Sequence, residues 1–174
     1  SDPVRHRFCG EAGGEICRAA AAGPWQEMQV AAEEAYDRTD ACSFTTFVAY
    51  EWTGGPANLH RNVVFRNAEV PALPVSWVET KSPWKLWDQL ESGCRQGVPG
   101  CEVLAIPHNS NLSAGTMFQT VNDEGEPLSA ADARRRVRNE PSVEIMQHKG
   151  ASECSIATSN DELCGFESLA YDSF

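Results

Sequence analysis

The spacing of apolar residues along the chain predicts three amphipathic helices separated by polar, Gly-containing connections. The first spans residues 24–38, where Pro24 stands in the first turn and the apolar side chains recur on one stripe. The second spans residues 82–93 and ends at a glycine. The third spans residues 130–138, and Ser129 with an acidic residue three positions on supplies a capping signal.

Short segments rich in β-branched and aromatic residues predict strands between these helices. Residues 44–51 and 60–65 are two such segments, and Thr53-Gly54-Gly55-Pro56 breaks the chain between them. Residues 103–106 and 143–146 predict two more strands. The alternation of helices and strands predicts an α/β fold, either a layer or a barrel, with its chemistry at the C-terminal ends of parallel strands.

Three potential metal ligands stand where predicted strands begin or end: Glu51, His60 and His108. In an antiparallel pair, Glu51 and His60 could lie opposite each other, with Cβ atoms roughly 5 Å apart. His108 follows the 103–106 strand directly after Pro107. One carboxylate and two imidazoles suit zinc, iron or manganese. The three residues are therefore candidate ligands of one metal centre.

Simpler roles exist for each residue taken alone. A glutamate at a strand end is more often a surface or hydrogen-bonded carboxylate, and a single histidine is more often a satisfied core or loop imidazole. Their joint placement favours metal ligation.

Three further residues are candidate substrate contacts: Lys149, Asn109 and Arg61. Lys149 follows the last predicted strand, where its ammonium could hold an anionic group as a point charge. An ordinary surface lysine is the alternative. Asn109 flanks His108 and could orient it or contact substrate, although asparagine in a turn needs no function.

Most of the seven cysteines fall into pairs that are local in the sequence. These pairs are Cys9 with Cys17, Cys94 with Cys101, and Cys154 with Cys164, which leaves Cys42 over. Local pairs in loops predict disulfide bonds and an oxidising compartment, the periplasm or the exterior. Reduced structural cysteines are the alternative. The spacing matches neither a zinc ribbon nor a c-type haem motif.

Composition narrows the classes of partner. The 174 residues suffice for a single domain, residues 1–174, and a mean hydropathy of -0.40 is ordinary for a soluble globular protein. A net charge of -11 argues against nucleic acid and suits a bound divalent cation, although acidity that only maintains solubility is the simpler reading. No apolar run approaches the ~18 residues of a membrane span.

Five stretches containing these residues give the chain a resemblance to the PHP (polymerase and histidinol phosphatase) superfamily. The resemblance is closer to a related bacterial group of proteins of unknown function (DUF3604). The stretches are FTTFVAYEWT (44–53), NLHRNVVFR (58–66), LAIPHNSNLSAGTMF (104–118), VEIMQHKGASEC (143–154) and DELCGFE (161–167). The resemblance implies a distorted (β/α)7 TIM-like barrel that holds two or three divalent metal ions, Zn, Mn or Fe, and hydrolyses phosphate esters.

Residue by residue, the resemblance makes Glu51 a bridging carboxylate, His60 a ligand on the adjacent strand, and His108 a ligand at the following strand end. The H-x-H motif of the family's first strand and the Asp-x-His motif of its last strand are absent from these residues. The sequence therefore predicts the central part of a longer metal-dependent hydrolase of small anionic esters, completed by other segments of the same polypeptide. The alternative is a non-catalytic secreted binding or structural domain.

Overall fold

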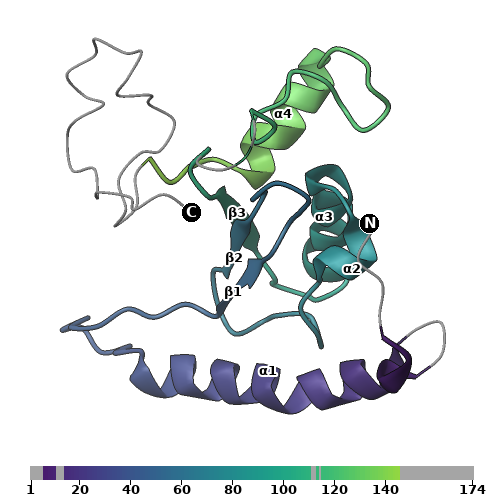
Figure 1. The fold of residues 1–174 in the computed structure, drawn as a ribbon. Coiled ribbons are helices and arrows are strands. Elements are labelled where there is room, and N and C mark those ends of the chain that lie inside the picture. Colours follow the sequence, from purple (N-terminus) through teal and green to yellow (C-terminus); the bar gives the residue numbers. More distant parts are fainter. Residues whose placement is uncertain (1–5, 11–13, 111–112, 114, 146–174) are drawn as a thin grey trace, which may run out of the picture.

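The structure is a computed structural model that describes residues 6–10, 14–110, 113 and 115–145. Its described part is a mixed α/β unit with a small sheet at the centre (Figure 1). The elements, in chain order, are η1 (Arg7–Cys9), α1 (Glu15–Ala35), β1 (Ala49–Trp52), β2 (Arg61–Phe65), α2 (Trp77–Thr80), α3 (Pro83–Leu90), the π-helical turn η2 (Glu91–Arg95), β3 (Val103–Pro107) and α4 (Ala130–Asn139).

The sheet has the order β1-β2-β3, and both strand pairs are antiparallel. The antiparallel pairing expected between residues 44–51 and 60–65 is therefore confirmed, whereas the expectation that parallel strands carry the site is wrong for the described part of the chain. Residues 66–102 leave β2 and return to β3 at the same end of the sheet, because Phe65 pairs with Val103. The alternation of helices and strands does not reveal this return, since the same pattern also fits a crossover to a parallel strand.

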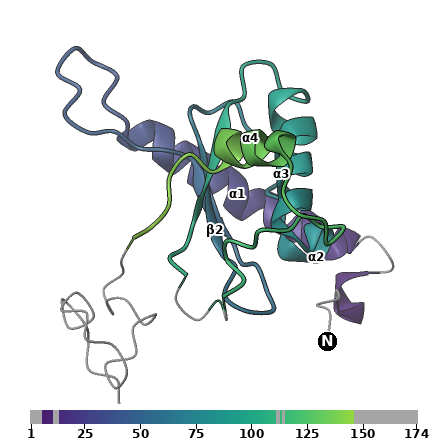
Figure 2. The same ribbon diagram turned by 90° about the horizontal axis from the view of Figure 1, so that it is seen from above.

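The two faces of the sheet have different surroundings. Successive side chains in a strand point to opposite faces. One face packs against the helices and supplies much of the core, and α2 and α3 lie on one side of the strands in both views (Figures 1 and 2). The other face keeps half-buried apolar side chains: Val64, Leu104 and Ile106.

Helix α1 begins earlier than the sequence predicts, at Glu15, so Pro24 lies inside the helix and not in its first turn. The run of alanines before Pro24 favours helix strongly enough to carry the element past the proline. Trp25 is the only buried residue of α1, and its indole N–H donates to the carbonyl oxygen of Pro71 at 2.9 Å. Trp25 is therefore the main buried contact of this long helix, and the half-buried Ala32 packs against the same core.

Strand β1 is shorter than predicted, because regular pairing begins only at Ala49. Before it, Phe44 and Phe47 are exposed, and a further ladder-like bond joins the Phe65 N–H to the Val48 carbonyl. The short helix α2 was not predicted. A capping box between Ser76 and Glu79 closes its first turn.

The C-terminal half of the described chain follows the prediction more closely. Helix α4 forms as expected, with the capping box between Ser129 and Asp132. Residues 143–145 are not a strand, although the Glu144 N–H donates to the Pro107 carbonyl at 3.0 Å. The rest of that predicted strand lies outside the described residues.

A buried ion pair joins β2 to the end of α4. The Nε of Arg61 lies 3.0 Å from Oε1 of Glu140, and the side chains are only 2% and 3% exposed. The same carboxylate oxygen accepts a hydrogen bond from the indole N–H of Trp87 at 3.1 Å. The guanidinium also donates to the carbonyls of Leu59 and Met117. Arg61 therefore connects the sheet, α3, α4 and two loops.

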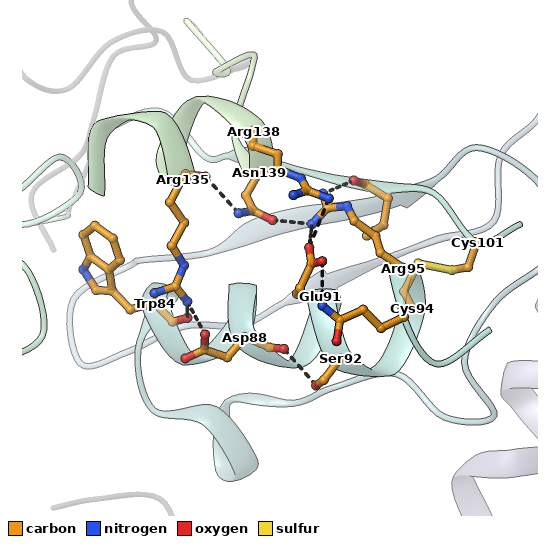
Figure 3. A network of polar contacts seen from close by, with 12 residues as sticks. Trp84, Asp88, Glu91, Ser92, Cys94, Arg95, Cys101, Arg135, Arg138 and Asn139 are labelled. Atoms are coloured by element: carbon orange, nitrogen blue, oxygen red, sulfur yellow. Dashed lines mark hydrogen bonds and ion pairs between the residues drawn. A yellow bond between two sulfur atoms is a disulfide. The ribbon is translucent and has the colours of Figure 1, made fainter. Parts of the chain in front are cut away.

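A second polar network fastens α4 to α3 and η2 (Figure 3). Arg95 donates to Asn139 Oδ1 at 2.9 Å and to the Val103 carbonyl at 2.7 Å. Burial alone would raise the pKa of Glu91, but hydrogen bonds from Gln96 and Arg95 and the nearby Arg138 charge outweigh it and lower that pKa. Glu91 therefore stays ionised beside the arginines.

Two of the predicted disulfides are confirmed. Cys9–Cys17 and Cys94–Cys101 have Cα separations of 4.8 and 5.3 Å, within the range a disulfide requires. Cys42 is free and exposed. Cys154 and Cys164 lie outside the described residues. The two bonds are compatible with an extracellular or secreted protein.

We expect removal of the buried disulfide in the variant Cys94→Ser/Cys101→Ser to lower the free energy of unfolding by about 2 to 3 kcal/mol, because the unfolded chain regains the freedom of the closed loop. Urea unfolding under oxidising conditions measures the change. Cys42→Ser is the matched control, with an expected change within about 0.5 kcal/mol. Equal stability of the double variant and the wild type would contradict the assignment.

We expect Glu140→Ala to lower the free energy of unfolding by about 3 to 5 kcal/mol, because Arg61 would stay buried without its charge partner. Glu33→Ala is the control, since its partner Arg38 is exposed. That change should cost at most about 1 kcal/mol. Similar losses in the free energy of unfolding for the two variants, measured by denaturant unfolding, would show that the buried Arg61 pair stabilises the fold no more than an exposed pair does.

Candidate functional site

The three predicted metal ligands meet at one edge of the sheet. Glu51 lies in β1, His60 immediately precedes β2, and His108 immediately follows β3. The pairing continues beyond β2 and β3, since the His108 N–H donates to the His60 carbonyl at 3.0 Å. Strand alternation places all three side chains on the open face, opposite the helices. In an antiparallel sheet, one strand's start and its neighbours' ends share an edge, so the residues converge without parallel strands.

The side chains of these residues are in contact. Nδ1 of His60 lies 2.7 Å from Oε1 of Glu51, and the rings of His60 and His108 are 5.9 Å apart between centroids, in an edge-to-face arrangement. The sequence placed Glu51 opposite His60, whereas the register places it opposite Asn62. The contact between Glu51 and His60 is therefore diagonal, which long side chains can span.

The Nδ1 atom of each imidazole lies at hydrogen-bond distance from an oxygen atom. A carboxylate and a carbonyl oxygen can only accept hydrogen bonds, so Nδ1 of His60 donates to Glu51, and Nδ1 of His108 donates to the Asn109 carbonyl at 2.7 Å. In each neutral ring the lone pair then resides on Nε2. This is the usual preparation of a metal-binding histidine, in which an outer oxygen holds the ring through its other nitrogen.

A tight loop sets the spacing between Glu51 and His60. The Leu59 N–H donates to the Gly54 carbonyl, and the peptide bond between Gly55 and Pro56 is cis. A Cβ atom at Gly54 would come within 2.4 Å of the Trp52 ring and 2.7 Å of the Leu59 carbonyl oxygen. Only glycine therefore fits at this position in the observed loop.

The donor set suits a divalent cation, but its placement does not form a complete site. Among the residues that the structure describes, no group of three or more His, Cys, Asp or Glu side chains could hold a metal ion as it stands. The Glu51 carboxylate is directed at His60, and its side chain is 51% exposed. The described chain thus presents two oriented imidazoles and one carboxylate, which are part of a coordination set.

The predicted substrate contacts are not all at this edge. Asn109 is buried and orients His108 through its backbone carbonyl. Arg61 points to the opposite face of the sheet, where Glu140 neutralises it. Lys149 lies outside the described residues.

Sequence reasoning missed Glu144. Its Oε2 accepts a hydrogen bond from the Asn109 N–H at 3.2 Å, and its own N–H donates to the Pro107 carbonyl. This places a carboxylate beside the turn that carries His108. Glu144 lies within the strand that the sequence predicts over residues 143–146, and a carboxylate among these apolar residues was the available signal.

An apolar hollow of about 660 Å³ occupies the same open face. Its floor includes Val64, Leu104 and Ile106, and Ile106 is two residues from His108, or about 7 Å along the strand. Arg66 and Arg138 are among its polar lining residues. The candidate site thus borders an apolar surface.

The fold and this edge define a mixed α/β protein with a carboxylate–imidazole cluster on an open sheet. Residues 6–174 match the family described as "Protein of unknown function (DUF3604)", and the chain belongs to that family. No curated protein and no solved structure matches it significantly. In the described part of the chain, no helix is long and apolar enough to span a membrane.

We expect the 174-residue chain to bind Zn²⁺ through His60 and His108. In a Cys42→Ser background, which removes the free thiol, His60→Ala and His108→Ala should each weaken binding at least about tenfold, and Glu51→Gln about tenfold because His60 loses its orienting carboxylate. Isothermal titration calorimetry measures the affinities. His6→Ala is the control and should bind as the parent does; parent-like affinity in His60→Ala would remove that residue from the centre.

Proposed function

We propose that this chain carries part of the metal centre of a PHP-type, metal-dependent hydrolase that acts on small anionic esters, foremost phosphate esters. The observation that supports the proposal is the meeting of Glu51, His60 and His108 on one face at one sheet edge. The resemblance of the surrounding stretches to the PHP superfamily points the same way.

His60 and His108 would hold the ion through Nε2, and Glu51 and the Asn109 carbonyl keep the imidazole rings in place. A divalent ion supplies a Lewis acid and lowers the pKa of a water molecule toward ~7. In the hydrolysis, the water oxygen bonds to phosphorus, the P–O bond to the alcohol breaks, and a proton passes to the leaving oxygen. No protein nucleophile is required.

The proposal includes a complete barrel. The remaining strands would pair with the edge strands β1 and β3 and bring further ligands to the end of the sheet that holds two imidazoles and one carboxylate. Two or three ions, as in PHP enzymes, would need those additional ligands. The disulfides fit a periplasmic or otherwise secreted location for this enzyme.

A second candidate is a non-catalytic secreted domain, in which the same residues serve stability. The hydrogen bond between Glu51 and His60 favours this candidate, because the Glu51 carboxylate is then used to hold a neighbouring side chain and not to bind an ion. The two candidates differ in the complete polypeptide: an H-x-H motif upstream and an Asp-x-His motif downstream belong to the enzyme only.

We expect His108→Ala in the complete polypeptide to abolish hydrolysis of a responsive phosphate ester and to lower the metal content, since the Lewis acid and the activated water are lost together. Steady-state kinetics and metal analysis of the same preparation measure both effects. Full activity with full metal occupancy in this variant would exclude His108 as a ligand.

Lys149→Ala should act differently, because a charge that contacts the anionic group in both ground and transition states contributes uniform binding. We expect KM to rise more than kcat falls. Lys85→Ala, an exposed residue of α3, is the control and should leave both constants unchanged. An unchanged KM in Lys149→Ala would show that this lysine does not contact the substrate.

A further inference from the structure

A second pocket, of about 470 Å³, lies on the helix-covered side of the sheet, away from the candidate metal centre. Its walls come from the loop that joins β1 to β2, from α2 and α3, from residues 116–123 and from α4. Its volume is within the range of small-molecule sites. The residues that give it chemical character are Trp77, Trp84, Trp87, Arg61, Lys81 and Arg136.

The aromatic part of the lining is held in place. The rings of Trp84 and Trp87 meet edge to face with centroids 4.7 Å apart, and both side chains are largely buried. The Trp87 N–H is fixed on Glu140. Trp77 stands edge to face with Trp52 at 5.1 Å. Three of the five tryptophans of the chain therefore line one pocket, in which Trp77 is half-buried and offers the most accessible ring, while Trp84 and Trp87, 8% and 1% exposed, form the wall beside it.

The charged part of the lining is positive, although the whole chain is acidic. Glu140, which does not line the pocket, neutralises the charge of Arg61. Arg136 donates to the neutral Gln119 carbonyl at 3.0 Å, and its guanidinium carbon lies 5.6 Å from the centre of the Trp84 ring. Lys81 is the other cation of the lining, and Asp123 is the one acidic residue among the lining residues. Arg136 is therefore a cation of the lining whose hydrogen bond goes to a neutral group, in a chain of net charge -11.

We propose that this pocket binds a small ring-bearing carboxylate, with the ring against the tryptophans and the carboxylate on the Arg136 side. A ring gains from contact with fixed indoles, and a carboxylate matches the Arg136 guanidinium, whose hydrogen-bond acceptor is a neutral carbonyl. The site is separate from the proposed metal centre, since Arg61 and His60 point to opposite faces of the sheet.

The test is isothermal titration calorimetry of the 174-residue chain with 2-naphthoate in the presence of EDTA, which prevents carboxylate binding through a metal. We expect saturable binding, at least about fivefold weaker for the neutral 2-naphthamide and undetectable for acetate. His108→Ala should bind 2-naphthoate as the parent does, so failure of the metal proposal leaves this result unaffected.

Arg136→Gln should weaken 2-naphthoate binding about fivefold to tenfold, and Arg136→Lys should restore most of the affinity, because it keeps the charge. Arg134→Gln is the matched control on the same helix and does not line the pocket. Thermal unfolding of each variant confirms that it is folded. Equal affinity for the amide, equal effects of the two arginine-to-glutamine changes, or no binding would each overturn the proposal.

Discussion

The buried pair of Arg61 and Glu140 is the interaction on which the rest of the described structure depends. A guanidinium inside a protein is costly unless it is paired and its N–H groups find acceptors. Glu140 and two carbonyls meet these needs, and they bring together β2, the end of α4 and two loops. Since His60 is the neighbour of Arg61, the same pair fixes where the candidate site begins.

Antiparallel pairing on both sides of β2 explains why the three candidate ligands meet. Glu51 and His108 lie at the ends of β1 and β3 and His60 at the start of β2, so one sheet edge gathers them on one face. The opposite face packs into the core, and the second pocket, lined by Trp77, Trp84 and Trp87, lies on that side of the sheet. Because side chains alternate between the two faces of a strand, the carboxylate and imidazole groups lie on one face of the sheet. The tryptophans and the arginine of the second pocket lie on the side of the other face.

The sequence predicted what depends on local patterns. The strand after His60, the helix capped by Ser129 and two local disulfides follow from alternation, capping chemistry and spacing, and they are confirmed. The direction of β3 could not be predicted, because it depends on the end of the sheet at which residues 66–102 bring the chain back.

The convergence of Glu51, His60 and His108 was anticipated from strand ends, with the right direction for β1 and β2 and the wrong direction for β3. The partner of Arg61 could not be predicted, since Glu140 is 79 residues away in the chain. Arg61 is not placed for substrate contact beside His60, because adjacent residues in a strand point to opposite faces.

The measurement that tests the central claim most directly is a crystal structure of the complete polypeptide grown with Zn²⁺, with anomalous diffraction recorded at the zinc absorption edge. The account predicts an anomalous peak about 2.0 to 2.1 Å from Nε2 of both His60 and His108. Zinc bound elsewhere, with no anomalous peak beside His60 or His108, would contradict it.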